Sequence, residues 1–193
     1  MDYIEAVNFL ENGNAKKSID FFKDNDYLLE YAYSLFMLGK FDEAKKIFGD
    51  IDSRRADWAK KIISIVQNQF VGYPTYFQIR SFLEIDIDML IKNRQIDFVQ
   101  QILNYANFFN QINNESYKFF GRVLLKNGYP DGCKFFLDKS KDVCYNDSEL
   151  QFLYVEYYLF INDIENTKKA IEKCLAVNSE YYPAKRIKVK LGV

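Results

Sequence analysis

The sequence has no histidine among its 193 residues, and it has little glycine, proline and cysteine. Without histidine the chain lacks the commonest general base and metal ligand, and Ser-His and Cys-His dyads are excluded. The eight glycines form no phosphate-binding loop motif, and with only three prolines we expect no long disordered linkers. We therefore expect neither an enzyme nor a bound cofactor.

The three cysteines, Cys133, Cys144 and Cys174, are scattered and include no CxxC pair, which indicates a reducing compartment. The opening segment MDYIEAVNFLENG has neither a basic start nor a long apolar run, so no signal peptide is predicted. No other stretch is long and apolar enough to span a bilayer. The combination predicts a soluble, cytoplasmic protein.

The charges nearly cancel, with 26 basic and 27 acidic residues and a net charge of −1. Proteins that bind nucleic acid or membrane surfaces usually carry a basic excess, so we expect neither partner. Aromatic residues are plentiful, with 18 Phe and 15 Tyr, and the 49% hydrophobic content can fill a sizeable core. Most of these rings are expected in that core.

Helical hairpins repeat along the chain. Their candidate turn residues are Gly13, Gly39, Arg94, Gly128 and Asn162, and the last three are 34 residues apart. Five residues past each turn the side chain is small or β-branched: Ser18, Ala44, Val99, Cys133 and Thr167. Nine residues past each turn it is large and apolar: Phe22, Phe48, Leu103, Leu137 and Ile171. Aligned columns of this kind indicate an internal repeat.

Helix packing explains these columns. A tight turn between antiparallel helices needs a residue that tolerates a positive φ, which favours Gly or Asn. At Arg94 the neighbouring Asn93 is the expected left-handed residue. Small side chains belong where the two helices cross most closely, and larger ones fill the wider gap one turn further on.

The columns resemble the tetratricopeptide repeat (TPR) family, whose hairpin repeats every 34 residues. Segments 28–51, 117–140 and 154–179 carry the resemblance, and LLEYAYSLFMLGKFDEAKKIFGDI at 28–51 is the best match. The resemblance implies an all-α fold, a right-handed α-solenoid of antiparallel helical hairpins. It also implies peptide binding in the concave groove lined by the first helix of each hairpin.

The repeat loses its phase near residues 71–74, where the sequence VGYP interrupts the helical pattern. We therefore predict two parts, 1–70 with a capping helix at 54–70, and 75–193 with a terminal capping helix. Segment 82–90 alternates polar and apolar residues, which favours a strand locally, but Leu83, Ile87 and Leu90 also fit helical spacing. We predict a helix there.

The resemblance places candidate binding residues on the inward-facing helices. The full inward set would include Glu30, Tyr33, Phe36, Glu84, Ile85, Asp88, Lys118, Phe119, Arg122, Lys126, Phe152, Glu156 and Leu159. From it we select as the peptide- or protein-binding site Tyr33, Asp88, Lys118, Phe119, Arg122, Lys126, Phe152 and Glu156. We expect Tyr33, Phe36 and Phe160 to be exposed as pockets or as a dimer surface.

Lys118, Arg122 and Lys126 lie four residues apart and would share one helical face, where like charges repel. Two interpretations remain open. The charges could be offset by Glu84, Asp88, Glu149 and Glu156 on neighbouring repeats. They could instead form a basic strip that binds an acidic peptide segment, with apolar pockets beside it.

The sequence therefore favours a non-catalytic scaffold that binds a protein or peptide segment, and the basic strip, where it binds, would select an acidic one. A self-assembly module that forms homodimers or larger oligomers is the alternative. A remote alternative is a metal-dependent transferase or hydrolase that uses Asp86 and Asp88, a pair that can hold a divalent cation in other folds. For that pair the simpler interpretation is two solvent-facing carboxylates on a helix.

Overall fold

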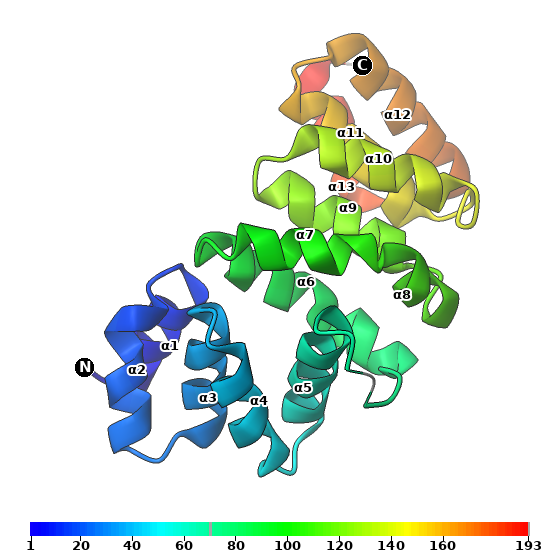
Figure 1. Cartoon of the computed structure of the whole chain (residues 1–193). Coiled ribbons are helices and arrows are strands. Elements are labelled where there is room, and N and C mark those ends of the chain that lie inside the picture. The colour runs from blue at the N-terminus through cyan, green and yellow to red at the C-terminus, as the bar shows by residue number, and fades with distance from the viewer. Residues whose placement is uncertain (70, 193) are drawn as a thin grey trace. The chain divides into compact units, whose positions relative to one another are not determined.

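The computed structural model describes residues 1–69 and 71–192, and this part of the chain contains thirteen α-helices and no strand (Figure 1). The predicted all-α class is confirmed, and segment 82–90 lies within a helix. None of the described helices is both long enough and apolar enough to cross a membrane.

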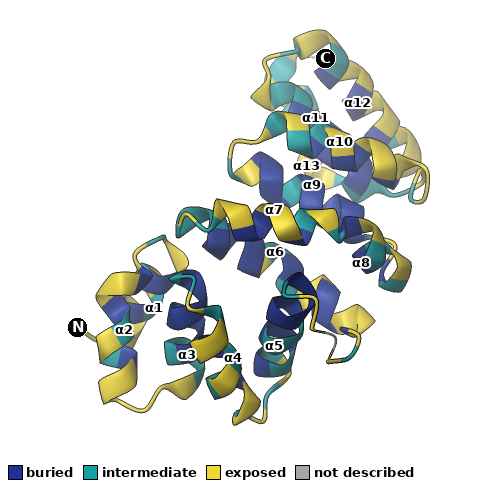
Figure 2. Cartoon of the chain, in the orientation of Figure 1, coloured by how far each residue is buried: buried dark blue, intermediate teal, exposed yellow. Residues whose placement is uncertain are grey.

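The helices form two compact units, Met1–Ile112 and a second that begins at Asn113. The first unit contains α1 (Tyr3–Glu11), α2 (Ala15–Asp24), α3 (Leu28–Met37), α4 (Phe41–Gly49), α5 (Arg54–Val66), α6 (Tyr76–Lys92), α7 (Ile96–Asn104) and α8 (Ala106–Ile112). The second contains α9 (Ser116–Lys126), α10 (Pro130–Lys141), α11 (Ser148–Phe160), α12 (Ile164–Val177) and α13 (Tyr182–Leu191). In Figure 2 buried residues line the helix faces that pack within each unit.

Every predicted turn residue joins two helices with a positive φ. The angles are 84° at Gly13, 76° at Gly39, 64° at Arg94, 82° at Gly128 and 58° at Asn162. The expectation that Asn93 takes the left-handed position is wrong, because its φ is −85° and Arg94 takes that position. The side-chain amide of Asn93 bonds instead to residues on either side of the turn between α1 and α2. Its oxygen accepts from the backbone N–H of Ala15, and its nitrogen donates to the Leu10 carbonyl.

The column of small residues lies where paired helices cross. All five of its members are buried: Ser18, Ala44, Val99, Cys133 and Thr167. In the hairpin of α9 and α10, a Cβ placed on Gly121 would lie 2.8 Å from Cδ2 of Leu137, so these helices approach too closely for a larger residue. The large apolar column is buried as well, apart from the half-buried Leu103, beside which Ile102 takes the core position.

The predicted break at residues 71–74 is a loop between α5 and α6 inside the first unit. Helix α5 ends at Val66, before the predicted end at residue 70, which itself lies outside the described residues. Helix α6 belongs with the N-terminal helices because Asn93 bonds to the α1–α2 turn and Gly13 of that turn touches the Lys92 carbonyl. The contacts therefore group α1 to α8 in one unit and α9 to α13 in the other.

Candidate functional site

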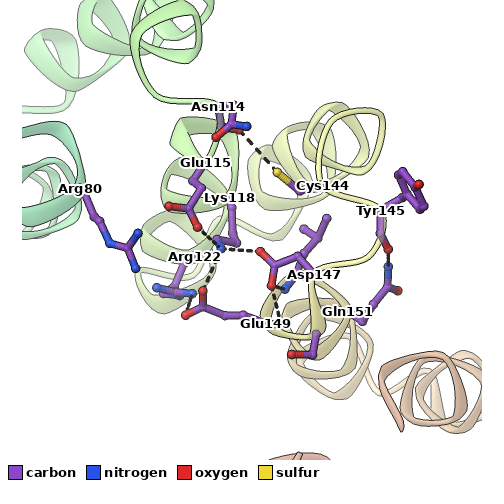
Figure 3. A network of polar contacts seen from close by, with 12 residues as sticks. Arg80, Asn114, Glu115, Lys118, Arg122, Cys144, Tyr145, Asp147, Glu149 and Gln151 are labelled. Atoms are coloured by element: carbon purple, nitrogen blue, oxygen red, sulfur yellow. Dashed lines mark hydrogen bonds and ion pairs between the residues drawn. The ribbon is translucent and has the colours of Figure 1, made fainter. Parts of the chain in front are cut away.

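Lys118 of α9 is the centre of a polar network in the second unit (Figure 3). Its side chain is 1% exposed, and its ammonium nitrogen contacts three carboxylates. Glu115 lies at 2.8 Å just before α9, Asp147 at 2.5 Å just before α11, and Glu149 at 2.8 Å on α11. Asp147 is also the N-cap of α11, because its carboxylate accepts the backbone N–H groups of Glu149 and Leu150.

The network stabilises the charged forms of Lys118, Asp147 and Glu149. Burial lowers the pKa of Lys118, but hydrogen bonds to Asp147, Glu115 and Glu149 outweigh it and raise the pKa above its usual 10.5. Desolvation raises the pKa of Asp147 and Glu149, but bonds to Lys118 reverse this effect and hold both pKa values below their usual range. The ammonium therefore stays protonated and both carboxylates stay ionised at neutral pH.

Arg122 lies one turn further along α9 and shares a carboxylate with Lys118. Its Nη2 atom is 2.5 Å from Oε1 of Glu149, whose other oxygen bonds to Lys118. Glu149 therefore offsets the repulsion between the two cations, as the first interpretation of the basic strip predicted. Glu149 was among the residues predicted to offset the charges of Lys118 and Arg122, whereas Glu115 and Asp147 were not.

Glu115, Asp147 and Glu149 form a cluster of three acidic residues whose ligand atoms lie within 4.8 Å of one another. No other group of three potential metal-ligating His, Cys, Asp or Glu residues occurs in the described parts of the chain. The ammonium group of Lys118 bonds to all three carboxylates. A lysine already supplies the positive charge that a metal ion would bring, so the cluster is explained without one.

A groove of about 580 Å³ lies beside this network, between α9, α11 and the segment before α13. Its lining combines apolar rings with charges of both signs: Arg122, Leu125, Lys126, Glu149, Phe152, Leu153, Glu156, Phe160 and Tyr181. Four of the predicted binding residues, Arg122, Lys126, Phe152 and Glu156, are brought together here. Leu125, Leu153 and Tyr181 were not predicted as binding residues. The sequence pattern of Leu125 and Leu153 is that of core positions, and Tyr181 precedes a predicted capping helix.

Aromatic residues give the groove an accessible apolar surface. Phe160 is 50% exposed at the end of α11, as predicted, and Phe152 is half-buried two turns earlier. The Phe152 ring packs on Tyr181 with centroids 5.4 Å apart, which fixes one wall of the groove. Glu156 lies between the two phenylalanines on α11, and desolvation raises its pKa although the charge of Arg122 opposes the shift.

The remaining predicted site residues lie elsewhere. The expectation that Tyr33 and Phe36 are exposed is wrong: Tyr33 is 3% exposed and Phe36 is fully buried. Arg55 of α5 lies over the Tyr33 ring, and Phe98 of α7 packs against Phe36. Phe119 is also buried, at 5% exposure. Asp88 is buried in the first unit, where it pairs with Lys92 of its own helix at 2.9 Å.

Asp86, the other residue of the Asp86–Asp88 pair, bonds to side chains of the same unit. It is 1% exposed, it forms an ion pair with Arg55, and it accepts a 2.5 Å hydrogen bond from Nε1 of Trp58. The Arg55 guanidinium also lies over the Tyr33 ring at 4.5 Å and the Phe82 ring at 4.7 Å. The interpretation of Asp86 and Asp88 as solvent-facing carboxylates is therefore wrong, and Asp86 has a structural environment.

The three cysteines are free thiols. Cys133 and Cys174 are buried, in keeping with their predicted packing role, and burial raises the pKa of both. Cys144 is partly exposed, but desolvation raises the pKa of its thiol as well. Raised pKa values disfavour the reactive thiolate, so none of the three has the environment of a nucleophile.

Comparison with known proteins adds no family to this description: no protein-family model, no curated protein and no solved structure matches the chain.

Proposed function

We propose that the chain is a non-catalytic protein-interaction scaffold, and that the groove of the second unit binds a protein or peptide segment. The hairpins would form a right-handed α-solenoid of the TPR type. Five hairpin turns at positive φ and the buried column of small residues support that assignment. The proposal includes cytoplasmic localisation, on the basis of the scattered free cysteines.

The observation that carries the proposal is the groove itself, in which aromatic rings lie beside charged side chains. Exposed aromatic rings next to fixed charges are typical of recognition surfaces, because the rings lose water on binding while the charges set orientation. Phe160 offers half of its surface, and Phe152 and Tyr181 form a wall against which a side chain could pack. A volume of about 580 Å³ lies within the usual range of ligand pockets, so side chains of a bound segment would fit.

An acidic segment was the partner suggested by the basic strip, and the contacts argue against Lys118 as its anchor. Three carboxylates of the same unit already surround that ammonium group. Displacing them would leave buried charges without partners, which costs more free energy than a surface ion pair returns. The proposed contacts are therefore those of Phe152, Phe160, Arg122, Lys126 and Glu156.

Self-assembly is the second candidate, and a specific feature favours it. Ile4 on α1 is 72% exposed and Leu28 at the start of α3 is 52% exposed, so the first unit has apolar surface that a second copy could cover. Light scattering over a wide concentration range tests this alternative. A mass that stays at the monomer value at every concentration would eliminate it.

A random library of about twelve-residue peptides, displayed on phage and panned over the full chain, tests the main proposal. Recovered peptides are then synthesised with a fluorescent label and titrated by anisotropy against wild type, Phe160→Asp and Phe135→Asp. Phe135 is the matched control, because it is 55% exposed on α10 and does not line the groove.

We expect Phe160→Asp to weaken binding about tenfold or more and Phe135→Asp to leave it unchanged. Equal affinity for both variants, or no recovered peptide, would contradict the proposal.

A further inference from the structure

One face of α11 carries a carboxylate between two aromatic rings. Phe152, Glu156 and Phe160 are spaced four residues apart, so they form a single stripe along the helix, and all three line the groove. Phe160 is 50% exposed and Glu156 is exposed, so both are accessible from the groove. Aromatic faces and a carboxylate both attract a cation, and together they form a surface suited to one.

The carboxylate of Glu156 is not committed to another side chain. Within residues 1–69 and 71–192 it makes no hydrogen bond and no ion pair, and only the charge of Arg122 acts on it from nearby. Arg122 directs its Nη2 atom to Glu149 at 2.5 Å, and Glu149 also bonds to Lys118. Glu149 therefore pairs with Lys118 and Arg122 of α9, while Glu156 lines the groove without an ion pair of its own in the part of the chain that the structure describes.

We infer that the segment bound in this groove places a lysine or arginine side chain against Glu156, between Phe152 and Phe160. This inference rests on the proposed function and names the chemistry of its partner. The aliphatic part of such a side chain would pack on the rings while its charged end reaches the carboxylate. An acidic side chain in the same place would be repelled by Glu156 and would compete with Glu149 for Arg122.

The test uses the same peptide library panned over three full-length proteins: wild type, Glu156→Gln and Glu172→Gln. Glutamine keeps the size of the side chain and removes its charge. Glu172 makes a matched control, because it is an exposed glutamate on α12 that does not line the groove. Recovered sequences are compared, and one lysine-containing peptide is synthesised together with a version in which norleucine replaces the lysine.

We expect wild type and Glu172→Gln to enrich lysine or arginine at one position, and Glu156→Gln to lose that preference while still recovering peptides. The lysine peptide should bind Glu156→Gln about tenfold more weakly than wild type, and the norleucine peptide should bind both proteins equally.

Recovered peptides with no basic preference, with an acidic preference, or with the same basic preference on Glu156→Gln would overturn the inference and leave the groove intact as a binding site. Recovery of no peptide on any of the three proteins would overturn the proposed function itself, and the inference with it.

Discussion

The ammonium nitrogen of Lys118 lies 2.5 Å from a carboxylate oxygen of Asp147, and this contact links α9 to the start of α11. The two residues are far apart in sequence, and Asp147 simultaneously caps α11 by accepting from the Glu149 and Leu150 nitrogens. One ion pair thus fixes both the position of α11 and the beginning of that helix. Because α9 and α11 carry most of the groove lining, the groove depends on this pair.

Removing the charge of Lys118 should therefore destabilise the second unit. Lys118→Met removes the ammonium group that bonds to Glu115, Asp147 and Glu149, and we expect a loss of about 2 kcal/mol in the free energy of unfolding. The estimate is below that for a fully buried pair because water reaches the carboxylates. Urea titration followed by circular dichroism measures it.

The control is Lys169→Met, which breaks an exposed ion pair with Glu165 on α12. Surface pairs of this kind contribute little, so its stability should stay within about 0.5 kcal/mol of wild type. Similar losses in the two variants would show that the Lys118 network has no special role.

The same network predicts how stability depends on pH. Asp147 and Glu149 have pKa values below their usual 3.8 and 4.5 in the folded chain, so their stabilising contribution is present above those values. It is lost as the pH falls through the lower folded values. Glu156 acts in the opposite sense, since its pKa is raised.

The stability difference between wild type and Lys118→Met separates the network from Glu156 and from the other groups on which Lys118 does not act. It should shrink as the pH is lowered from about 6 to about 3, because protonated carboxylates no longer need the lysine. Urea titrations at each pH measure it, and a difference that stays constant or grows would refute this account.

Two turn glycines should respond differently to substitution by alanine. Gly13 and Gly128 both have positive φ values, 84° and 82°, so alanine strains the backbone at each position. At Gly13 a Cβ would also collide with the Lys92 carbonyl oxygen, whereas at Gly128 it would meet no described atom within 4 Å. We expect losses of about 3 kcal/mol for Gly13→Ala and about 1 kcal/mol for Gly128→Ala by thermal unfolding. Equal losses would mean that the close approach of α6 to the α1–α2 turn is not important.

Asp86 should be a structural residue and not a metal ligand. Asp86→Ala leaves the Arg55 guanidinium without its ion-pair partner and removes the acceptor of Trp58, so we expect a loss of about 3 kcal/mol. Trp58 is the only tryptophan, and its fluorescence reports on this site directly. Mg²⁺, Mn²⁺ and Ca²⁺ should leave both the fluorescence and the unfolding midpoint of wild type unchanged. A saturable change with any of them would revive the transferase or hydrolase alternative.

The hairpin architecture could be predicted from sequence because local chemistry determines it. A residue at positive φ must be one that tolerates that conformation, and a close helix crossing requires a small side chain. Gly39 and Gly128 meet the first requirement, and the buried Ala44 and Cys133 meet the second, so both can be recognised in the sequence. At Arg94 the prediction is wrong. Residue preferences assign the positive φ to the neighbouring Asn93, but Arg94 adopts it.

Which helices share a core could not be read from the repeat. The sequence places a break at 71–74, but the side chain of Asn93 and the backbone at Gly13 join α6 to α1 and α2. The prediction that Tyr33 is exposed is wrong for a similar reason, because helix α5 places Arg55 over the Tyr33 ring. Contacts between segments distant in sequence determine both the packing of α6 and the burial of Tyr33. Such contacts cannot be predicted from the residue types at repeat positions.

The candidate site was predicted in part. Charge spacing on α9 correctly indicated that Lys118 and Arg122 need opposing charges, and Glu149 supplies one. Asp147 was missed because an aspartate before a helix is explained fully by capping, which hides its second role. Phe152 and Glu156 both line the groove, because residues four apart lie on one face of a helix and their spacing in the sequence predicts this.

The most direct test of the groove as the binding site is to map where a bound peptide lies. A peptide recovered by display is synthesised with a photoreactive benzophenone at its central position, cross-linked to the full chain and located by mass spectrometry. Cross-links should fall on α11 near Phe152 and Phe160 and on α9 near Arg122 and Lys126. Cross-links confined to α10, α12 or the first unit would contradict the account.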